Sequence, residues 1–169
     1  MTRIRPATPA DVPLIRALIY ELAAYEREPH SARITEAQLL EDGFGPDPYY
    51  ECLIAEVEME NGDTPAGFAL FFPIYSTWEG RSLCLEDLFV RPEFRGHGIG
   101  KALLTRVAAI AVERSCARLD WNVLTWNQPA IDFYRSLDAR LLDDWHRMRV
   151  SGDALAALAS AGTEAGAKA

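Results

Sequence analysis

Two spacings of apolar residues run along this chain, and each spacing predicts a different kind of element. Apolar residues three or four apart lie on one face of a helix. Thr8 before Pro9 marks a helix start, because the pair suits an N-cap and a first turn, and Thr35 with Gln38 has the spacing of a capping box. The predicted helices cover Thr8 to about Tyr25, Thr35 to about Asp42, Ile99–Ala111, Pro129–Leu137 and Asp153–Ala159.

Shorter apolar or alternating runs between these helices predict strands. Asn61-Gly62-Asp63 is a turn signal that joins two of them as a hairpin. The order of elements predicts a mixed α/β fold around one sheet, largely antiparallel in its first half and with one βαβ unit. The predicted strands lie near Ile4 and at Tyr49–Val57, Ala66–Tyr75, Leu83–Val90, Leu119–Leu124, Leu141–Leu142 and Trp145–Val150.

A glycine-rich loop joins the strand Leu83–Val90 to the following helix. It reads Arg95-Gly96-His97-Gly98-Ile99-Gly100, and Lys101 follows it. The first N–H groups of a helix have no intrahelical acceptor and carry partial positive charge, so glycines there let a phosphate approach the bare backbone. Glycines also serve turns that need unusual backbone angles. Three alternate glycines between two cations after a buried strand favour a diphosphate site.

Chain length, cysteine spacing and net charge narrow the set of possible functions and locations further. With 169 residues, we expect one domain over residues 1–150 and, over 151–169, a short helix with a disordered Ala/Gly tail. The sequence shows neither a membrane-length apolar run nor a signal peptide, and its three cysteines are widely spaced, so we expect a cytoplasmic protein without membrane partners. The net charge of −8 argues against nucleic acid, and the scattered histidines and cysteines predict no metal site.

Charge is unevenly distributed along the chain. The segment 20–63 is rich in acidic residues, whereas 91–118 is rich in arginine. The first segment suits a cationic ligand and the second suits phosphates. Solvated helix faces with ion pairs explain the same distribution, so charge alone leaves both interpretations open.

Several motifs together resemble the GCN5-related N-acetyltransferase (GNAT) family, which binds acetyl-CoA through an Arg/Gln-x-x-Gly-x-Gly/Ala loop. The motifs are IRPATPAD, LEDGFG, YYECLIAEV, IYSTWEGR, LEDLFV, RGHGIG and WNQPAIDFY, spread from Ile4 to Val150. They are similar to the diamine (spermidine/spermine) acetyltransferase branch, and IYSTWEGR and WNQ are most similar to its thialysine-acetylating members. The resemblance implies the GNAT fold, a mixed and mostly antiparallel central sheet with splayed central strands flanked by helices. It also implies acetyl-CoA as co-substrate, a small cationic amine as acceptor and a homodimer.

Acetyl transfer to an amine needs a base, because an aliphatic amine has a pKa near 10.4 and is mostly charged at neutral pH. It also needs an oxyanion donor and a proton for the departing thiolate. A carboxylate inside an apolar strand is costly and demands a reason. The resemblance places the base, acting through water, at Glu86 and the acid at Tyr134, with the Val90 N–H as oxyanion donor. Alternation along the strand puts Asp87 on the opposite face, so we expect it to be structural.

The resemblance also assigns binding residues. Asn127 matches a cofactor-contacting asparagine and also suits a helix cap before Pro129. Tyr25 and Glu26 match the amine channel, Trp78 suits stacking on a cation, and Asp120 and Trp121 are weaker candidates. The expected acetyl-CoA contacts are Leu88, Phe89, Val90, Arg95, Gly96, His97, Gly98, Ile99, Gly100, Lys101, Asn127 and Tyr134. The expected acceptor contacts are Tyr25, Glu26, Trp78, Glu86, Asn122 and Asp144.

Two positions depart from the family pattern. Ser76 stands where polyamine-specific members have an acidic residue, which favours a shorter or lysine-like amine over a long polyamine. Asp138 stands where the family has glycine after its last motif helix, and aspartate tolerates the left-handed backbone that this turn needs.

Other functions remain open on the sequence. Aminoglycosides or amino acids are alternative acceptors. A dinucleotide-binding oxidoreductase would use Asp120 on a ribose, but the loop is G-x-G-x-G rather than G-x-G-x-x-G. An inactive acyl-CoA-binding module would not need both Glu86 and Tyr134.

Overall fold

The computed structural model describes residues 1–166, with side chains to Ala161, and divides into two compact units. The first unit covers Met1–Asn122, and the second begins at Val123. The expectation that residues 1–150 form one domain stays a prediction.

A five-stranded sheet in the order β1-β2-β3-β4-β5 forms the centre of the first unit. Neighbouring strands are antiparallel except for β4 and β5, which are parallel and are joined through a helix. This topology confirms the predicted mixed, mostly antiparallel sheet and its βαβ unit. The strands are β1 (Thr2–Pro6), β2 (Glu51–Met59), β3 (Gly62–Ser76), β4 (Gly80–Val90) and β5 (Leu119–Trp121).

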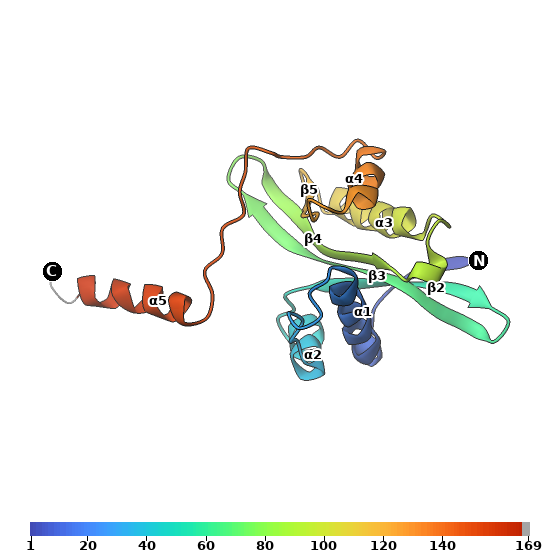
Figure 1. The fold of residues 1–169 in the computed structure, drawn as a ribbon, viewed down its shortest axis with the longest axis horizontal. Helices are drawn as coiled ribbons and strands as arrows, with labels where there is room; N and C mark the ends of the chain where they lie inside the picture. The colour runs from blue at the N-terminus through green and yellow to red at the C-terminus, as the bar shows by residue number, and fades with distance from the viewer. Residues whose placement is uncertain (167–169) are drawn as a thin grey trace. The chain divides into compact units, whose positions relative to one another are not determined.

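Helices cover both faces of this sheet (Figure 1). Helices α1 (Val12–Tyr25) and α2 (Glu36–Phe44) pack on one face, where Ile15, Leu18 and Phe68 belong to a shared buried core. Helix α3 (Ile99–Glu113) lies on the other face and buries an apolar stripe at the predicted spacing. Two short 3₁₀ turns, η1 (Pro9–Asp11) and η2 (Pro92–Phe94), precede α1 and α3.

Local signals account for where several of these elements begin. The Thr35 N–H donates to Gln38 Oε1 at 3.1 Å and the Gln38 N–H donates to Thr35 Oγ1 at 3.2 Å, which is the predicted capping box. The Thr8 N–H donates to Asp11 Oδ2 at 2.8 Å, so Thr8 starts the turn η1 rather than α1 itself. The hairpin between β2 and β3 turns at Glu60 and Asn61, and Gly62 directly after the turn has φ of 108°, which favours glycine.

A β-bulge interrupts β4 at the candidate base. Leu85 pairs with Phe71 and Asp87 pairs with Leu70, so Glu86 is an extra residue with no partner on β3. The bulge breaks the period of two. The alternation that placed Asp87 on the opposite face from Glu86 therefore does not apply, and that prediction is wrong.

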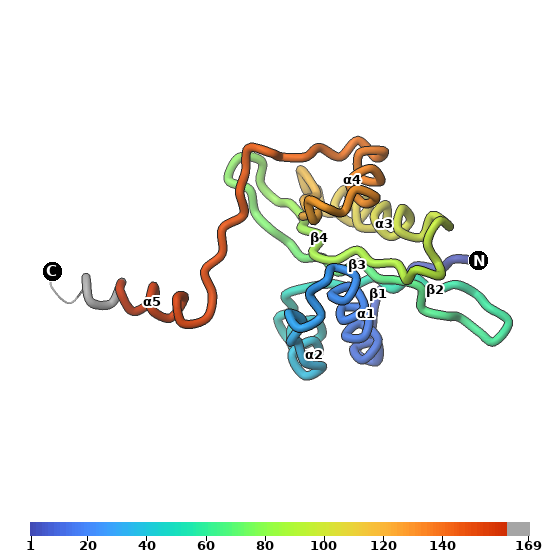
Figure 2. The backbone as a smooth tube through the Cα atoms, viewed as in Figure 1, coloured from blue at the N-terminus to red at the C-terminus, as the bar shows by residue number. Residues whose placement is uncertain are grey.

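The second unit contains α4 (Gln128–Arg135) and α5 (Asp153–Gly166). Asn127 caps α4, with Oδ1 accepting from the Ala130 N–H at 3.4 Å, and Asp138 adopts the expected left-handed backbone with φ of 62°. Within the described chain, residues 139–152 form no strand, so the predicted final strand pair is wrong. Figure 2 shows the backbone of this segment running from α4 to α5. The apolar alternation at 141–150 suits the two faces of a strand. A strand also needs a neighbouring strand to pair with its backbone N–H and C=O groups.

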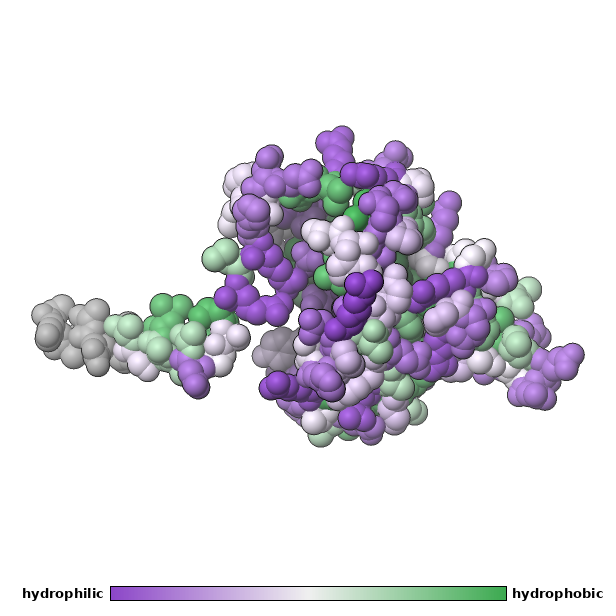
Figure 3. Space-filling view, in the orientation of Figure 1, coloured by the Kyte–Doolittle hydropathy of each residue, from purple (hydrophilic) through white to green (hydrophobic). Residues whose placement is uncertain are grey.

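Helix α5 continues past its predicted end at Ala159, and the part of the predicted tail at 167–169 lies outside the described residues. The helix presents apolar surface to solvent (Figure 3), where Leu155 and Leu158 are exposed.

Candidate active site

The glycine-rich loop has the backbone that an anion site requires. Gly96 has φ of 80° and Gly98 has φ of 77°, and a Cβ on either would meet no atom within 4 Å. Gly98 is the N-cap of α3, whose first N–H groups have no acceptor within the helix. The space above the loop is therefore open, and the loop fits a phosphate group approaching the backbone.

The edge of β4 is available to a ligand beyond Leu85. β5 pairs with β4 from Leu83 to Leu85, and among the described residues no strand pairs with Glu86–Val90 on that side. β5 ends at Trp121, beside Leu85, and so leaves the side of β4 beyond Leu85 uncovered by a strand of the described chain. Leu88, Phe89 and Val90 pair with β3 on one side, and the other side of this segment suits an extended ligand that forms main-chain hydrogen bonds.

Contacts to α1 and β3 hold the end of β4 in place. Arg91 donates to Glu21 through Nε at 2.9 Å and Nη2 at 2.7 Å, and its Nη1 donates to the Pro65 carbonyl at 2.9 Å. Gly67 passes so close to the Phe89 carbonyl that a Cβ there would overlap it. The position and angle of the Val90 N–H, the candidate oxyanion donor, therefore depend on these contacts.

Three carboxylates interact at the junction of α1 and β4. Burial and then the charge of Glu86 raise the pKa of Glu26, which follows the last residue of α1. Burial raises the pKa of Asp87 to about 7, and the charges of Glu86 and Glu26 add to the effect. This acidic group suits a cationic amine. Alternation along the strand did not predict that Asp87 belongs to this acidic group, because the bulge leaves no local signal in the sequence.

The Arg95 side chain contacts residues at the ends of β4 and α1. Its Nε donates to the Val90 carbonyl at 2.8 Å, and its guanidinium carbon lies 4.6 Å from the centre of the Tyr25 ring. The same carbon is 5.6 Å from the centre of the Phe89 ring. The charged end of Arg95 thus touches α1 and β4. His97 Nδ1 lies 3.4 Å from the Phe94 carbonyl oxygen.

The second unit holds Tyr134 and Asn127. Tyr134 lies on α4, where burial raises its pKa to about 12 and its ring centre lies 5.2 Å from that of Phe133. A phenol with this pKa stays protonated at neutral pH. Asn127 caps the same helix, so its two predicted roles are compatible.

A family model settles the class of protein. The acetyltransferase (GNAT) family model matches residues 15–138. The chain belongs to the GNAT family. This result confirms the resemblance drawn from the motifs and makes the chain an acetyl-transfer enzyme.

Individual relatives agree with this GNAT assignment. Thialysine N-epsilon-acetyltransferase of Sus scrofa is 40% identical over 163 residues, covering 92% of this chain and 96% of the relative. The spermidine/spermine N(1)-acetyltransferase-like protein 1 of Homo sapiens is 39% identical over 159 residues, covering 90% of this chain and 23% of that protein. Among solved structures, an integron cassette protein from the mobile metagenome of V. cholerae has a TM-score of 0.74 and 26% identity, covering 94% of this chain and 97% of the other.

The position that departs from polyamine-specific GNAT members is part of a hydrogen-bonded turn. Ser76 Oγ accepts from the N–H groups of Trp78 and Glu79 at 3.2 Å each, and Arg118 Nη1 donates to it at 3.3 Å. Arg118 also pairs with Glu79 at 2.6 Å and with Asp120 at 2.9 Å. A guanidinium thus already lies beside Ser76, and Asp120 is engaged with it.

The other predicted acceptor residues lie on the surface. Trp78 is 83% exposed at the β3–β4 turn, and Asn122 is exposed just after β5. Asp144 is exposed in the second unit, within a stretch without helix or strand. Their roles in this GNAT enzyme stay predictions.

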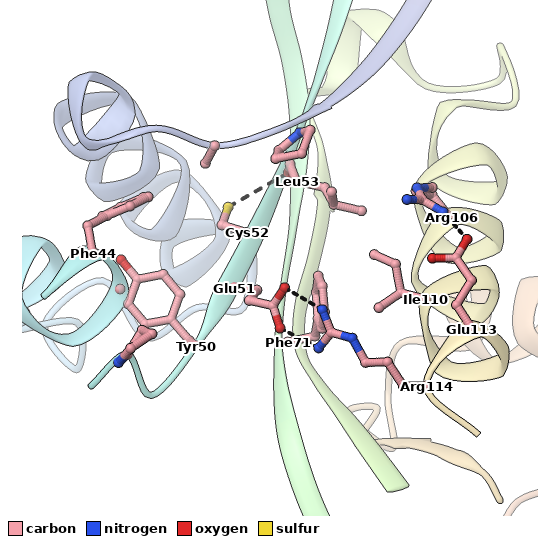
Figure 4. A pocket seen from close by; sticks show the side chains of 14 residues that line it. Phe44, Tyr50, Glu51, Cys52, Leu53, Phe71, Arg106, Ile110, Glu113 and Arg114 are labelled. Carbon is pink, nitrogen blue, oxygen red and sulfur yellow. Dashed lines mark hydrogen bonds and ion pairs between the residues drawn. The ribbon is translucent and has the colours of Figure 1, made fainter. Parts of the chain in front are cut away.

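A separate hollow of about 370 Å³ opens at the start of β2 and contains none of the predicted site residues (Figure 4). Tyr50 and Phe44 point into it from one side, and the Arg114–Glu51 ion pair lines the other. Its lining charges are paired, because Arg106 also meets Glu113 at 2.8 Å.

Among the described residues, every helix is too short or too polar to span a bilayer.

Proposed function

We propose that this GNAT enzyme moves the acetyl group of acetyl-CoA directly to the primary amine of a small cationic acceptor. The loop supports the donor part of the proposal: Gly96 and Gly98 leave open space before the N-terminus of α3. GNAT acetyltransferases use acetyl-CoA as acetyl donor. The backbone from Gly96 to Gly100, with Lys101, would hold its diphosphate, and the free edge of β4 at Leu88–Val90 would pair with the pantetheine arm.

The acceptor part rests on the three carboxylates. The charge of Glu86 contributes to the raised pKa of both Glu26 and Asp87, and the same negative potential attracts an ammonium group. Glu86 is the proposed base, since the bulge frees it from pairing with β3 and leaves it exposed to water. It removes a proton from the ammonium through a water molecule, so that the amine nitrogen can form its new bond to the acetyl carbon.

Tyr134 is the proposed acid. When the carbon–sulfur bond breaks, the thiolate of CoA takes up a proton. A thiol has a pKa near 8.5 and the Tyr134 phenol has one of about 12, so full transfer from the phenol runs uphill. Tyr134 therefore acts first as a hydrogen-bond donor to the sulfur. Once its proton passes to the thiolate, the phenolate promptly takes a replacement proton from solvent.

We further propose a lysine-like side chain, such as that of thialysine, as the preferred acceptor. The name of the Sus scrofa relative, similar along almost its whole length, supports this class. Ser76 supports it independently, because a neutral hydroxyl that already accepts from Arg118 offers no carboxylate to hold the distal ammonium of a long polyamine. The homodimer and the cytoplasmic location stay predictions from the sequence.

The test is an acetylation screen with acetyl-CoA and thialysine, lysine, short diamines, spermidine, spermine and an aminoglycoside. We expect kcat/KM for thialysine to exceed that for spermine by about tenfold or more, the effect of one missing favourable charge contact. Glu86→Gln should lower kcat by about 10²-fold, whereas Glu60→Gln, in the exposed β2–β3 turn, should leave it unchanged. A preference for spermine would contradict the proposed acceptor, and transfer to none of these amines would contradict the proposed function.

A further inference from the structure

The Arg95 side chain connects the glycine-rich loop to two other elements. Its Nε–H donates to the carbonyl of Val90, the last residue of β4, at 2.8 Å. Its guanidinium lies 4.6 Å from the ring centre of Tyr25, the last residue of α1. One cation therefore touches the ends of both elements that carry the acidic group.

The two contacts use different parts of the guanidinium. Arginine can donate through its edge while its flat face lies against an aromatic ring, which lysine does not reproduce. The Phe89 ring, 4% exposed, lies 5.6 Å from the same guanidinium carbon. Arg95 thus lies against two rings while its edge is directed at the backbone of β4.

Tyr25 and Val90 adjoin the residues that handle the acceptor. Tyr25 precedes Glu26, whose pKa is raised partly by the charge of Glu86, so the end of α1 is within electrostatic reach of the candidate base. Val90 ends the strand that carries Glu86. A residue that fixes both Tyr25 and Val90 fixes the distance between the acceptor channel and the edge of β4.

We propose that Arg95 is a positioning residue of the acceptor site, acting through Tyr25 and Val90, and that the diphosphate is held by the loop backbone and Lys101 without the Arg95 side chain. This inference rests on the proposed function. The loop then has two functions: its backbone binds the acetyl donor, and the Arg95 side chain orients the residues that contact the amine.

Two acetyl donors separate this role from a phosphate-binding role. Acetyl-CoA carries the diphosphate, and S-acetylpantetheine lacks it. With thialysine as acceptor, Arg95→Gln should raise the thialysine KM about fivefold with either donor, the effect of losing a cation–aromatic contact. The dissociation constant of acetyl-CoA, measured by calorimetry, should change less than about twofold. A KM change is informative because KM does not depend on the fraction of folded enzyme.

Matched variants test the contact itself. Tyr25→Phe keeps a ring beneath the cation and Tyr25→Leu removes it, so the Leu variant should reproduce the effect of Arg95→Gln and the Phe variant should show less. Arg95→Lys should rescue only part of the loss. In thermal unfolding without substrates, the Arg95→Gln and Tyr25→Leu shifts should be non-additive, because both remove one contact.

Other results would overturn the inference. If Arg95→Gln weakened acetyl-CoA binding several-fold, spared the S-acetylpantetheine KM and left the thialysine KM unchanged, Arg95 would be a phosphate ligand. Additive shifts in the double variant would show that the two side chains act separately. A wild-type enzyme that transfers acetyl to no amine would overturn this inference together with the proposed function, whereas normal wild-type turnover with an unchanged thialysine KM in Arg95→Gln would overturn this inference alone.

Discussion

Asp87 directly follows Glu86, the extra residue of the β-bulge in β4. Burial together with the charge of Glu86 raises the pKa of Asp87 to about 7. The usual pKa of an aspartate is 3.8, so the folded state holds this proton more tightly than the unfolded state does. Ionised Asp87 therefore destabilises the fold. The contribution of Asp87 to wild-type stability should fall as pH rises from about 4 to about 7, and the full penalty should remain above pH 7.

Asp87→Asn should remove that penalty. At pH 8 we expect the variant to be more stable than wild type by about 2 kcal/mol, a rise in Tm of about 5 °C, with a smaller difference at pH 5. Thermal unfolding across pH 4–8 measures this. Asp47→Asn, in an exposed loop, is the matched control and should follow wild type. Parallel pH profiles for the Asp87 variant and wild type would contradict the assigned coupling.

Gly98→Val should abolish acetyl-CoA binding. The variant places a branched side chain in the open space before α3, where the phosphate would lie, at a backbone φ of 77°. Backbone strain alone costs about 1–2 kcal/mol of stability. Gly62→Val controls for that strain, because Gly62 also has positive φ and open space but lies in the β2–β3 hairpin. Calorimetric titration should show binding to the Gly62 variant only, and normal binding to Gly98→Val would refute the diphosphate site.

The fold was predictable where local signals determine it. Thr35 and Gln38 define a capping box within four residues of sequence, and the hydrogen bonds between them are those the pattern predicts. The strand pair predicted at 141–150 failed because apolar alternation specifies a strand's faces but not its partner.

The site was predictable in part for a related reason. Spacing located the glycines, since their role depends on the backbone around them. The environment of Asp87 depends on a bulge that follows from pairing with β3, and the position of the Arg95 guanidinium depends on α1, distant in sequence. Long-range contacts of this kind leave no mark in a single sequence.

Tyr134→Phe should lower kcat by about 10²-fold or more while the affinity for acetyl-CoA barely changes, because the ring remains and the donor hydrogen is lost. Tyr50→Phe is a close control, since burial also raises the pKa of Tyr50 to about 12. Its hydroxyl donates to the Leu39 carbonyl at 2.7 Å, so this variant should lose about 1 kcal/mol of stability and keep its kcat. Steady-state kinetics beside thermal unfolding distinguishes the two. Equal kcat in Tyr134→Phe and wild type would remove Tyr134 from the mechanism.

Arg5→Gln should strongly destabilise the first unit. Arg5 donates to Asp11 at 2.7 and 2.8 Å and to Glu56 at 2.8 and 2.9 Å, and Glu56 is 7% exposed. Removing the guanidinium leaves buried carboxylates poorly compensated, at a cost of about 3 kcal/mol. Arg106→Gln breaks the exposed pair with Glu113 and should cost less than about 1 kcal/mol.

The pH dependence of this pair of variants gives a second readout. The Arg5 hydrogen bonds lower the pKa of both Asp11 and Glu56. A lowered pKa stabilises the fold above the unfolded values of 3.8 and 4.5, and the contribution is lost as pH falls through the folded values. Through these two groups wild type should therefore lose stability between about pH 5 and pH 2. Arg5→Gln should lose less over the same interval, because without the guanidinium the folded pKa values of Asp11 and Glu56 lie closer to the unfolded ones. Denaturant unfolding at pH 3 and pH 7 measures the difference, and an equal acid loss in both proteins would show that Arg5 does not hold these carboxylates in their charged form.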